Sequence, residues 1–91
     1  MSIRWTPTAL ADLQAVHAYI TADNVEAADK FVHVLKAIAA LEAHPHMGRS
    51  GRVPGTRELV ARPYVIAYRV ERAAVELLAI IHGARRWPEA L

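Results

Sequence analysis

The 91-residue sequence is long enough for one domain with a single thin core, because domains commonly contain about 100–150 residues. Apolar residues make up 54% of it, more than is usual in soluble domains, so we expect part of the apolar surface to face a partner chain. The absence of cysteine excludes disulfides and thiolate metal sites. No apolar run reaches the length of a signal peptide or a transmembrane helix, which fits a cytoplasmic protein.

The net charge of +2 is unevenly distributed along the chain. Residues 1–44 carry a charge of −2 and residues 45–91 carry +4, and every basic residue of the second half is an arginine. The planar guanidinium suits phosphates and carboxylates, so these arginines form either a solvated surface or a site for an acidic partner or nucleic acid. The net charge is too small to make nucleic-acid binding the default interpretation.

The first elements in chain order are a short strand and a helix. Residues 3–5 are predicted to form the strand, and Thr6 and Pro7 then have the types preferred at the N-cap and the first helical position. We expect this helix to run to about Thr21. Its predicted apolar face contains Leu10, Leu13, His17 and Ile20, with Ala9 and Val16 beside them.

A second helix is predicted after a link of two or three residues. Asp23 and Glu26 have the spacing of a capping box, and Pro45 should end the helix near His44. Two helices joined by so short a link pack as an antiparallel hairpin. The predicted apolar face of the second helix contains Phe31, Leu35, Ile38 and Leu41.

The apolar period changes from helical to strand-like near residue 55. Glycines and prolines mark a loop at residues 46–55, and strands are predicted at 56–61, 64–70 and 75–82. The break between the first two strands falls at Arg62-Pro63, and residues 71–74 form the second turn. The last strand is apolar enough to be either buried on both faces or central in the sheet.

The predicted fold is therefore α+β with the order β-α-α-β-β-β. Short connections require the last three strands to form an antiparallel meander, and we expect the N-terminal strand to join it in a small antiparallel sheet. The helical hairpin must cover one face of this sheet to bury its apolar stripes. The other face is then left open and carries part of the arginine set.

Five segments, in order along the chain, resemble the ParE/RelE superfamily of type II toxin–antitoxin toxins. They are WTP at residues 5–7 with ADL at 11–13 and YI at 19–20; PHMGRSGR at 45–52; GTRELV at 55–60; YVIAYRV at 64–70; and HGARRWP at 82–88. The last segment resembles the ending of the ParE-like branch. The resemblance covers residues 1–91 as a single toxin domain.

This resemblance implies the same β-α-α-β-β-β fold and a cognate antitoxin of the ParD-like or RelB-like class. ParE-like toxins poison DNA gyrase and are associated with plasmid stabilisation, whereas RelE-like toxins cut messenger RNA on the ribosome. A third possibility is a decayed toxin that retains only antitoxin binding. A shared fold does not decide among these functions.

RNA cleavage would need general acid–base groups and cations at the phosphate. The resemblance implies a lysine/arginine cluster and a late tyrosine for such enzymes, but this sequence has no lysine after Lys36 and no tyrosine after Tyr68. Glu58 alternates to the face opposite Arg57, so these two side chains are not expected to serve one centre. The residues left for a ribonuclease are Arg57, His82 and Arg85.

The missing acid–base set favours a toxin that acts by binding, with no catalytic residues and no cofactor, metal or membrane partner. We expect inhibition of DNA gyrase, with Arg57, Arg85 and Arg86 contacting the target. Each of these residues also has a purely structural interpretation. Arg57 would form a salt bridge on the sheet surface, and His82 would bond a neighbouring carbonyl. Arg85 and Arg86 would belong to a solvated tail. His44 and His46 are too few ligands for a metal site.

Overall fold

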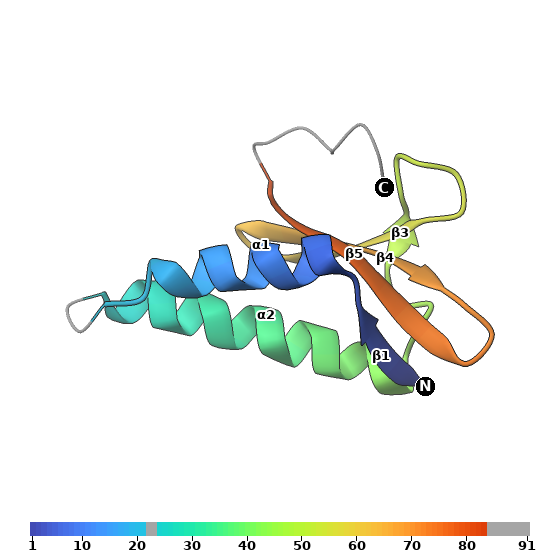
Figure 1. Cartoon of the computed structure of the whole chain (residues 1–91), viewed down its shortest axis with the longest axis horizontal. Helices are drawn as coiled ribbons and strands as arrows, with labels where there is room; N and C mark the ends of the chain where they lie inside the picture. The colour runs from blue at the N-terminus through green and yellow to red at the C-terminus, as the bar shows by residue number, and fades with distance from the viewer. Residues whose placement is uncertain (22–23, 84–91) are drawn as a thin grey trace.

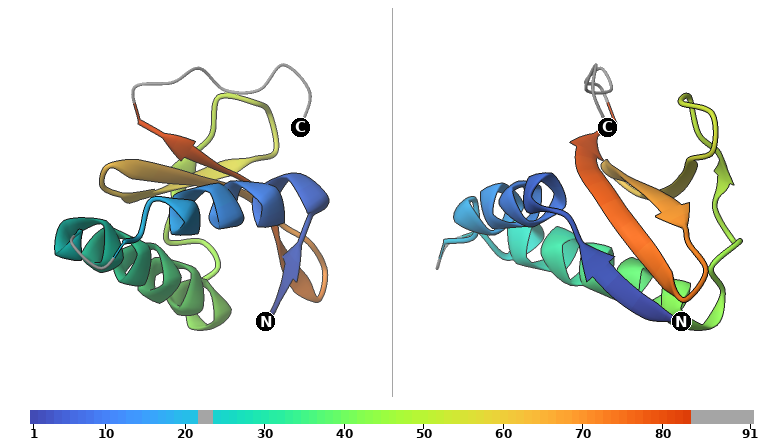
Figure 2. Two further views of the ribbon diagram at one scale, coloured as in Figure 1. Left: turned by 60° about the vertical axis from the view of Figure 1, so that its left-hand side comes forward. Right: turned by 45° about the vertical axis from the view of Figure 1, so that its right-hand side comes forward.

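The computed structural model describes residues 1–21 and 24–83, in which a helical hairpin packs on one face of a five-stranded sheet (Figure 1). The strand order across the sheet is β1-β5-β4-β3-β2. Two further views show both helices on the same side of β5 (Figure 2). The elements are β1 (Ser2–Trp5), α1 (Pro7–Ala18), α2 (Val25–Ala43), β2 (Arg49–Ser50), β3 (Arg57–Ala61), β4 (Tyr64–Val70) and β5 (Ala74–His82).

Helix α1 begins as the sequence predicts and ends earlier. The Thr6 hydroxyl accepts the Ala9 N–H at 3.2 Å, and proline occupies the start of the helix. The helix ends at Ala18, not near Thr21. Ala9 and Val16 are its buried residues, whereas the predicted face member Leu10 is 46% exposed, because the side that packs against β5 is the one with the smaller side chains.

Helix α2 is capped by Asn24, whose side-chain oxygen accepts the Ala27 N–H at 3.0 Å. The predicted capping box placed the N-cap one residue earlier, at Asp23, which lies outside the described residues. The helix ends at Ala43 with His44 as C-cap, as predicted. Its buried residues are Val34, Ile38 and Leu41, while of the other two predicted members Phe31 is half-buried and Leu35 is exposed.

The predicted meander is confirmed, since β3 pairs with β4 and β4 with β5, both antiparallel. A cis Arg62–Pro63 peptide joins the first pair, and a turn closed by the Glu71 N–H and the Ala74 carbonyl (2.8 Å) joins the second.

Two features of the sheet differ from the prediction. The N-terminal strand β1 pairs with β5 in parallel, so the sheet is mixed and not antiparallel. The connection between them is nearly the whole chain, which provides the long crossover that parallel pairing requires. The second feature is β2, a two-residue strand inside the predicted loop, which pairs antiparallel with the start of β3.

An irregularity in β5 makes this strand buried on both faces, as predicted. Ala67 pairs with Ala79 but Tyr68 pairs with Leu77, so Leu78 is an extra residue of the bulge type. The bulge reverses the alternation of side chains. The helix-facing core therefore includes Val75, Leu77 and Ile80, and the opposite face has its own buried cluster of Ala67, Leu78, Ala79 and Ile81.

The loop after α2 is fixed to the sheet by a glycine. Tyr68 is fully buried, and its hydroxyl accepts the Gly48 N–H at 2.9 Å. A Cβ at Gly48 would lie 2.6 Å from the Tyr68 hydroxyl and 2.7 Å from the Glu58 carbonyl oxygen. Only glycine allows this close approach, which positions β2 at the edge of the sheet.

Candidate functional site

A hollow of about 380 Å³ lies between the connected end of the helical hairpin, where α1 ends and α2 begins, and the ends of β4 and β5. We call it the hairpin hollow. Its walls come from both helices and from the sheet, so it is a surface on which a partner could contact all three elements at once. It is lined by Asp12, Ala15, Val16, Tyr19, Asn24, Glu26, Ala27, Lys30, Tyr64, Ile80 and His82.

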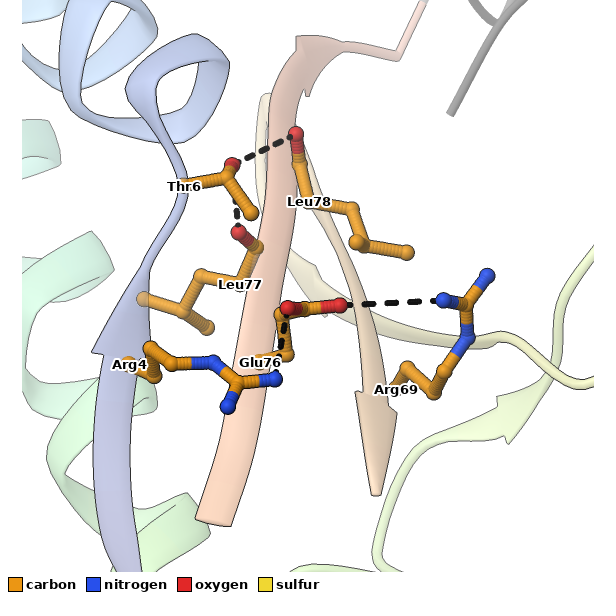
Figure 3. A network of polar contacts seen from close by, with 6 residues as sticks. All are labelled: Arg4, Thr6, Arg69, Glu76, Leu77 and Leu78. Carbon is orange, nitrogen blue, oxygen red and sulfur yellow. Dashed lines mark hydrogen bonds and ion pairs between the residues drawn. The ribbon is translucent and has the colours of Figure 1, made fainter. Parts of the chain in front are cut away.

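The hairpin hollow borders an edge of β5 that no strand covers. Strand β1 pairs with β5 only as far as Leu77. Beyond this point the side chains of Thr6 and Asp12 bind the backbone of β5 in place of a strand. The Thr6 hydroxyl donates to the Leu77 carbonyl at 2.7 Å and contacts the Leu78 carbonyl at 3.4 Å (Figure 3). The Asp12 carboxylate accepts the Ile80 N–H at 2.9 Å. Asp12 is therefore a structural residue, and its role could not be inferred from the apolar periodicity.

Arg57 lies at the start of β3 and binds the loop that follows α2. Its guanidinium donates to the Gly48 carbonyl at 2.9 Å and to the His46 carbonyl at 3.3 Å. The side chain is half-buried. These bonds differ from the surface salt bridge considered as the structural alternative, since the acceptors are backbone carbonyls and not a carboxylate.

Glu58 points to the opposite face from Arg57, as the strand alternation predicts. Its side chain is only 4% exposed and accepts a hydrogen bond from the Arg49 guanidinium at 3.2 Å. This pairing joins β2 to β3, because Arg49 and Glu58 are also register partners in the sheet.

The candidate ribonuclease residues within the described part of the chain are not brought together. The strand register places Arg57 level with Leu77, and places His82 level with Ala61. These two levels are four residues apart on β3, or about 13 Å. His82 is exposed and its ring meets the Tyr64 ring edge-on, with 5.7 Å between centroids. Arg85 and Arg86 lie outside the described residues.

The sheet face away from the helices carries arginine–glutamate pairs, in agreement with the expected arginine-bearing face. Arg4 of β1 and Arg69 of β4 both reach the Glu76 carboxylate of β5, at 2.7 and 3.6 Å (Figure 3). Strand alternation could have identified Arg4 and Arg69, because they alternate with apolar residues that face the helices. The single carboxylate offsets one of the two positive charges, so this cluster keeps a net charge of +1.

A second depression, of about 630 Å³, lies beside the turn between β3 and β4. We call it the basic hollow. Its described lining contains four basic residues and no carboxylate, and apolar side chains such as Val60 and Val65 form the rest. Lys30 is paired with Glu26 and Arg49 with Glu58, at 3.2 Å each, so Arg62 and His82 carry most of what the hollow offers an anionic partner. The sequence did not single out this surface because its members come from distant segments. The basic members are Lys30, Arg49, Arg62 and His82.

Two further findings limit what the described residues can do. No group of three or more His, Asp or Glu side chains within residues 1–21 and 24–83 is arranged to hold a metal ion. Neither described helix has the length and apolar character needed to span a membrane.

Comparison with known proteins gives consistent matches over nearly the whole chain. The family model described as "ParE toxin of type II toxin-antitoxin system, parDE" matches residues 3–87. The chain is 44% identical over 92 residues to the protein Y4kP of Sinorhizobium fredii, covering 98% of this chain and 95% of that protein. It is 38% identical over 82 residues to Toxin RelE2 of Caulobacter vibrioides, covering 89% and 93% of the two chains. A solved structure from the chromosomal ParDE system of P. aeruginosa superposes with a TM-score of 0.74 at 30% identity, covering 90% and 95%.

Proposed function

Because this chain belongs to the ParE toxin family and is the toxin of a type II toxin–antitoxin module, we propose that it acts in the cytoplasm by inhibiting DNA gyrase. The observation that supports this proposal is the separation of the candidate ribonuclease residues. Arg57 and His82 stand at different levels of the sheet, about 13 Å apart along the strands. One phosphodiester group spans only a few ångströms, and the Arg57 guanidinium is held by the Gly48 and His46 carbonyls, so this geometry does not favour contact of one phosphodiester with both side chains.

Proton transfer is the second argument for a toxin that acts by binding. An arginine guanidinium keeps its proton at neutral pH, so arginines can bind a phosphate but rarely act as acid or base. Histidine is the side chain suited to proton exchange near neutral pH, and His82 is the only histidine after His46. RNA cleavage needs both a base and an acid, which a single histidine supplies poorly.

The target contact is proposed for Arg57, Arg85 and Arg86, together with the basic hollow. Gly83 is part of the lining of the basic hollow, and Arg85 and Arg86 follow it in the sequence after one alanine. The charge of +4 in residues 45–91 supports an acidic or phosphate-bearing target. Gyrase bound to DNA offers both kinds of group.

A type II toxin has an antitoxin as its partner, and the hairpin hollow is the surface proposed for it here. Tyr19 on its rim is 66% exposed, and the β5 edge beyond Leu77 has no strand partner in the described structure. An antitoxin tail that folds on binding could place apolar side chains in the hollow and lie beside this edge, where Thr6 and Asp12 already bind the backbone of Leu77 and Ile80.

A reconstituted supercoiling assay with purified gyrase tests the proposed target. The toxin should inhibit supercoiling, and Arg85→Glu should weaken the inhibition because it reverses a charge at the proposed contact. The similarity to Toxin RelE2 favours mRNA cleavage as the second candidate function. If ribosome-bound transcripts are cut and His82→Ala stops the cutting, the gyrase proposal is wrong and the second candidate is right.

A further inference from the structure

Helix α2 has an exposed apolar stripe that is separate from its buried face. Its large members are Val25, Val32 and Leu35, which are 70%, 47% and 38% exposed. Val32 is nine residues from buried Leu41, which corresponds to about 180° around the helix. We call this surface the α2 stripe; it consists of Val25, Ala28, Val32, Leu35 and Ala39.

The spacing within the α2 stripe is that of a helix–helix seam. Val25, Val32 and Ala39 repeat every seven residues, and Ala28 and Leu35 repeat with the same period between them. Apolar residues alternating at intervals of three and four are typical of helices that pack side by side over their length. From Val25 to Ala39 the seam is about 21 Å long.

Charged residues beside the stripe indicate the partner and its direction. Asp29 and Lys36 are both exposed and lie seven residues apart, so they flank the stripe on the same side. Within the described part of the chain neither side chain takes part in a salt bridge. A partner helix that matches this flank must carry a basic group opposite Asp29 and an acidic group opposite Lys36.

We propose that the α2 stripe binds the α2 stripe of a second copy of this chain, with the two helices antiparallel about a two-fold axis. This arrangement places Val32 opposite the partner's Leu35 and brings Asp29 beside the partner's Lys36, twice by symmetry. In a parallel arrangement this flank would lie beside the partner's other flank, which carries Asn24 and Phe31, so neither Asp29 nor Lys36 would meet an opposite charge. The charges therefore match only in the antiparallel direction.

The dimer interface is distinct from the surfaces assigned above. The hairpin hollow uses Asn24, Glu26, Ala27 and Lys30 of α2, none of which belongs to the stripe. The antitoxin and a second copy of the chain can therefore bind at the same time. The proposed dimer does not depend on which target the toxin inhibits. A single seam of this length lies at the small end of protein interfaces, so the dimer should form at micromolar concentrations.

Sedimentation of the purified toxin from about 1 to 200 µM tests this interface, in a concentration range chosen for weak association. The mass should rise with concentration from 10.0 kDa toward twice that value. Val32→Glu should keep the protein monomeric over the whole range. His33→Glu is the matched control, because it places the same charge on an exposed neighbouring position outside the stripe and should leave the dimer intact.

Charge reversal tests the direction of packing without an apolar substitution. Asp29→Lys and Lys36→Asp should each weaken dimerisation about tenfold, because two attractive pairs become repulsive. The double variant restores opposite charges and should return to wild-type affinity. A wild-type chain that stays monomeric, a dimer that survives Val32→Glu, or a double variant that is no tighter than the single ones would each overturn the proposal.

Discussion

The two ends of the sheet use their polar side chains differently. At the end where β3 begins, Arg57, Tyr68 and Gly48 are joined by hydrogen bonds of 2.9 Å that hold the loop after α2. At the end where β5 finishes, Arg62 and His82 are exposed around the basic hollow. Substitutions of Gly48 and Tyr68 should therefore change stability, whereas substitutions at the second end, and of the proposed target contact Arg57, should change binding.

Gly48→Ala should give the largest effect. The new Cβ would lie 2.6 Å from the Tyr68 hydroxyl and 2.7 Å from a backbone oxygen, which cannot move freely. We expect a loss of about 2–4 kcal/mol in the free energy of unfolding, from overpacking together with the weakened hydrogen bond. Urea denaturation measures this loss.

Gly55→Ala is the comparison for that variant. Gly55 has a φ of +82°, but a Cβ there would meet no atom within 4 Å, so the cost should be only about 1 kcal/mol. If the two variants lose equal stability, the contact with Tyr68 is not what makes glycine necessary at position 48.

Asp12→Ala is expected to have the next largest effect. It removes the acceptor of the Ile80 N–H at the uncovered edge of β5, at a cost of about 1–3 kcal/mol. Asp12→Asn keeps a carbonyl oxygen as acceptor and should lose less than half as much. Hydrogen exchange at the Ile80 amide should accelerate in the alanine variant, and an unchanged rate would contradict this assignment.

Tyr68→Phe and Tyr64→Phe compare the same change at the two ends. The first removes the acceptor of the Gly48 N–H and should cost about 1 kcal/mol. The second removes a hydroxyl that makes no hydrogen bond among the described residues, and the thermal unfolding temperature should barely change. A larger loss of stability in Tyr64→Phe than in Tyr68→Phe would contradict the difference assigned to the two ends of the sheet.

Arg62→Glu should have the smallest effect on stability, within about 0.5 kcal/mol, because the side chain is exposed. Inhibition of gyrase should nevertheless weaken, since the charge of the basic hollow is reversed at one position. Arg72→Glu is the control, with the same charge change at an exposed position in the turn between β4 and β5. Equal inhibition of gyrase by the two variants would contradict a role of the basic hollow in binding the target.

Local sequence signals predicted most of the fold. The cap at Thr6, the helix end before Pro45 and the strand at residues 64–70 all depend on neighbouring residues, and the structure has them as predicted. The parallel partner of β1 lies 72 residues away, and a pattern of four residues carries no information about strand direction.

The candidate site was less predictable, because its geometry depends on contacts that have no sequence period. The bulge at Leu78 reverses the faces of β5 and turns Ile80 toward the helices, where Asp12 accepts its N–H. The partners of Arg57 are backbone carbonyls, which no residue type reveals. Alternation alone did predict that Glu58 and Arg57 occupy opposite faces.

The central claim, inhibition of gyrase without RNA cleavage, is tested most directly by expressing the toxin without its antitoxin. Plasmid supercoiling and transcript integrity would be measured in the same cells, with an Arg85→Glu toxin expressed to the same level as the control. The account predicts loss of negative supercoiling, intact ribosome-bound transcripts and a weaker effect for the variant. Cleaved transcripts with normal supercoiling would contradict it.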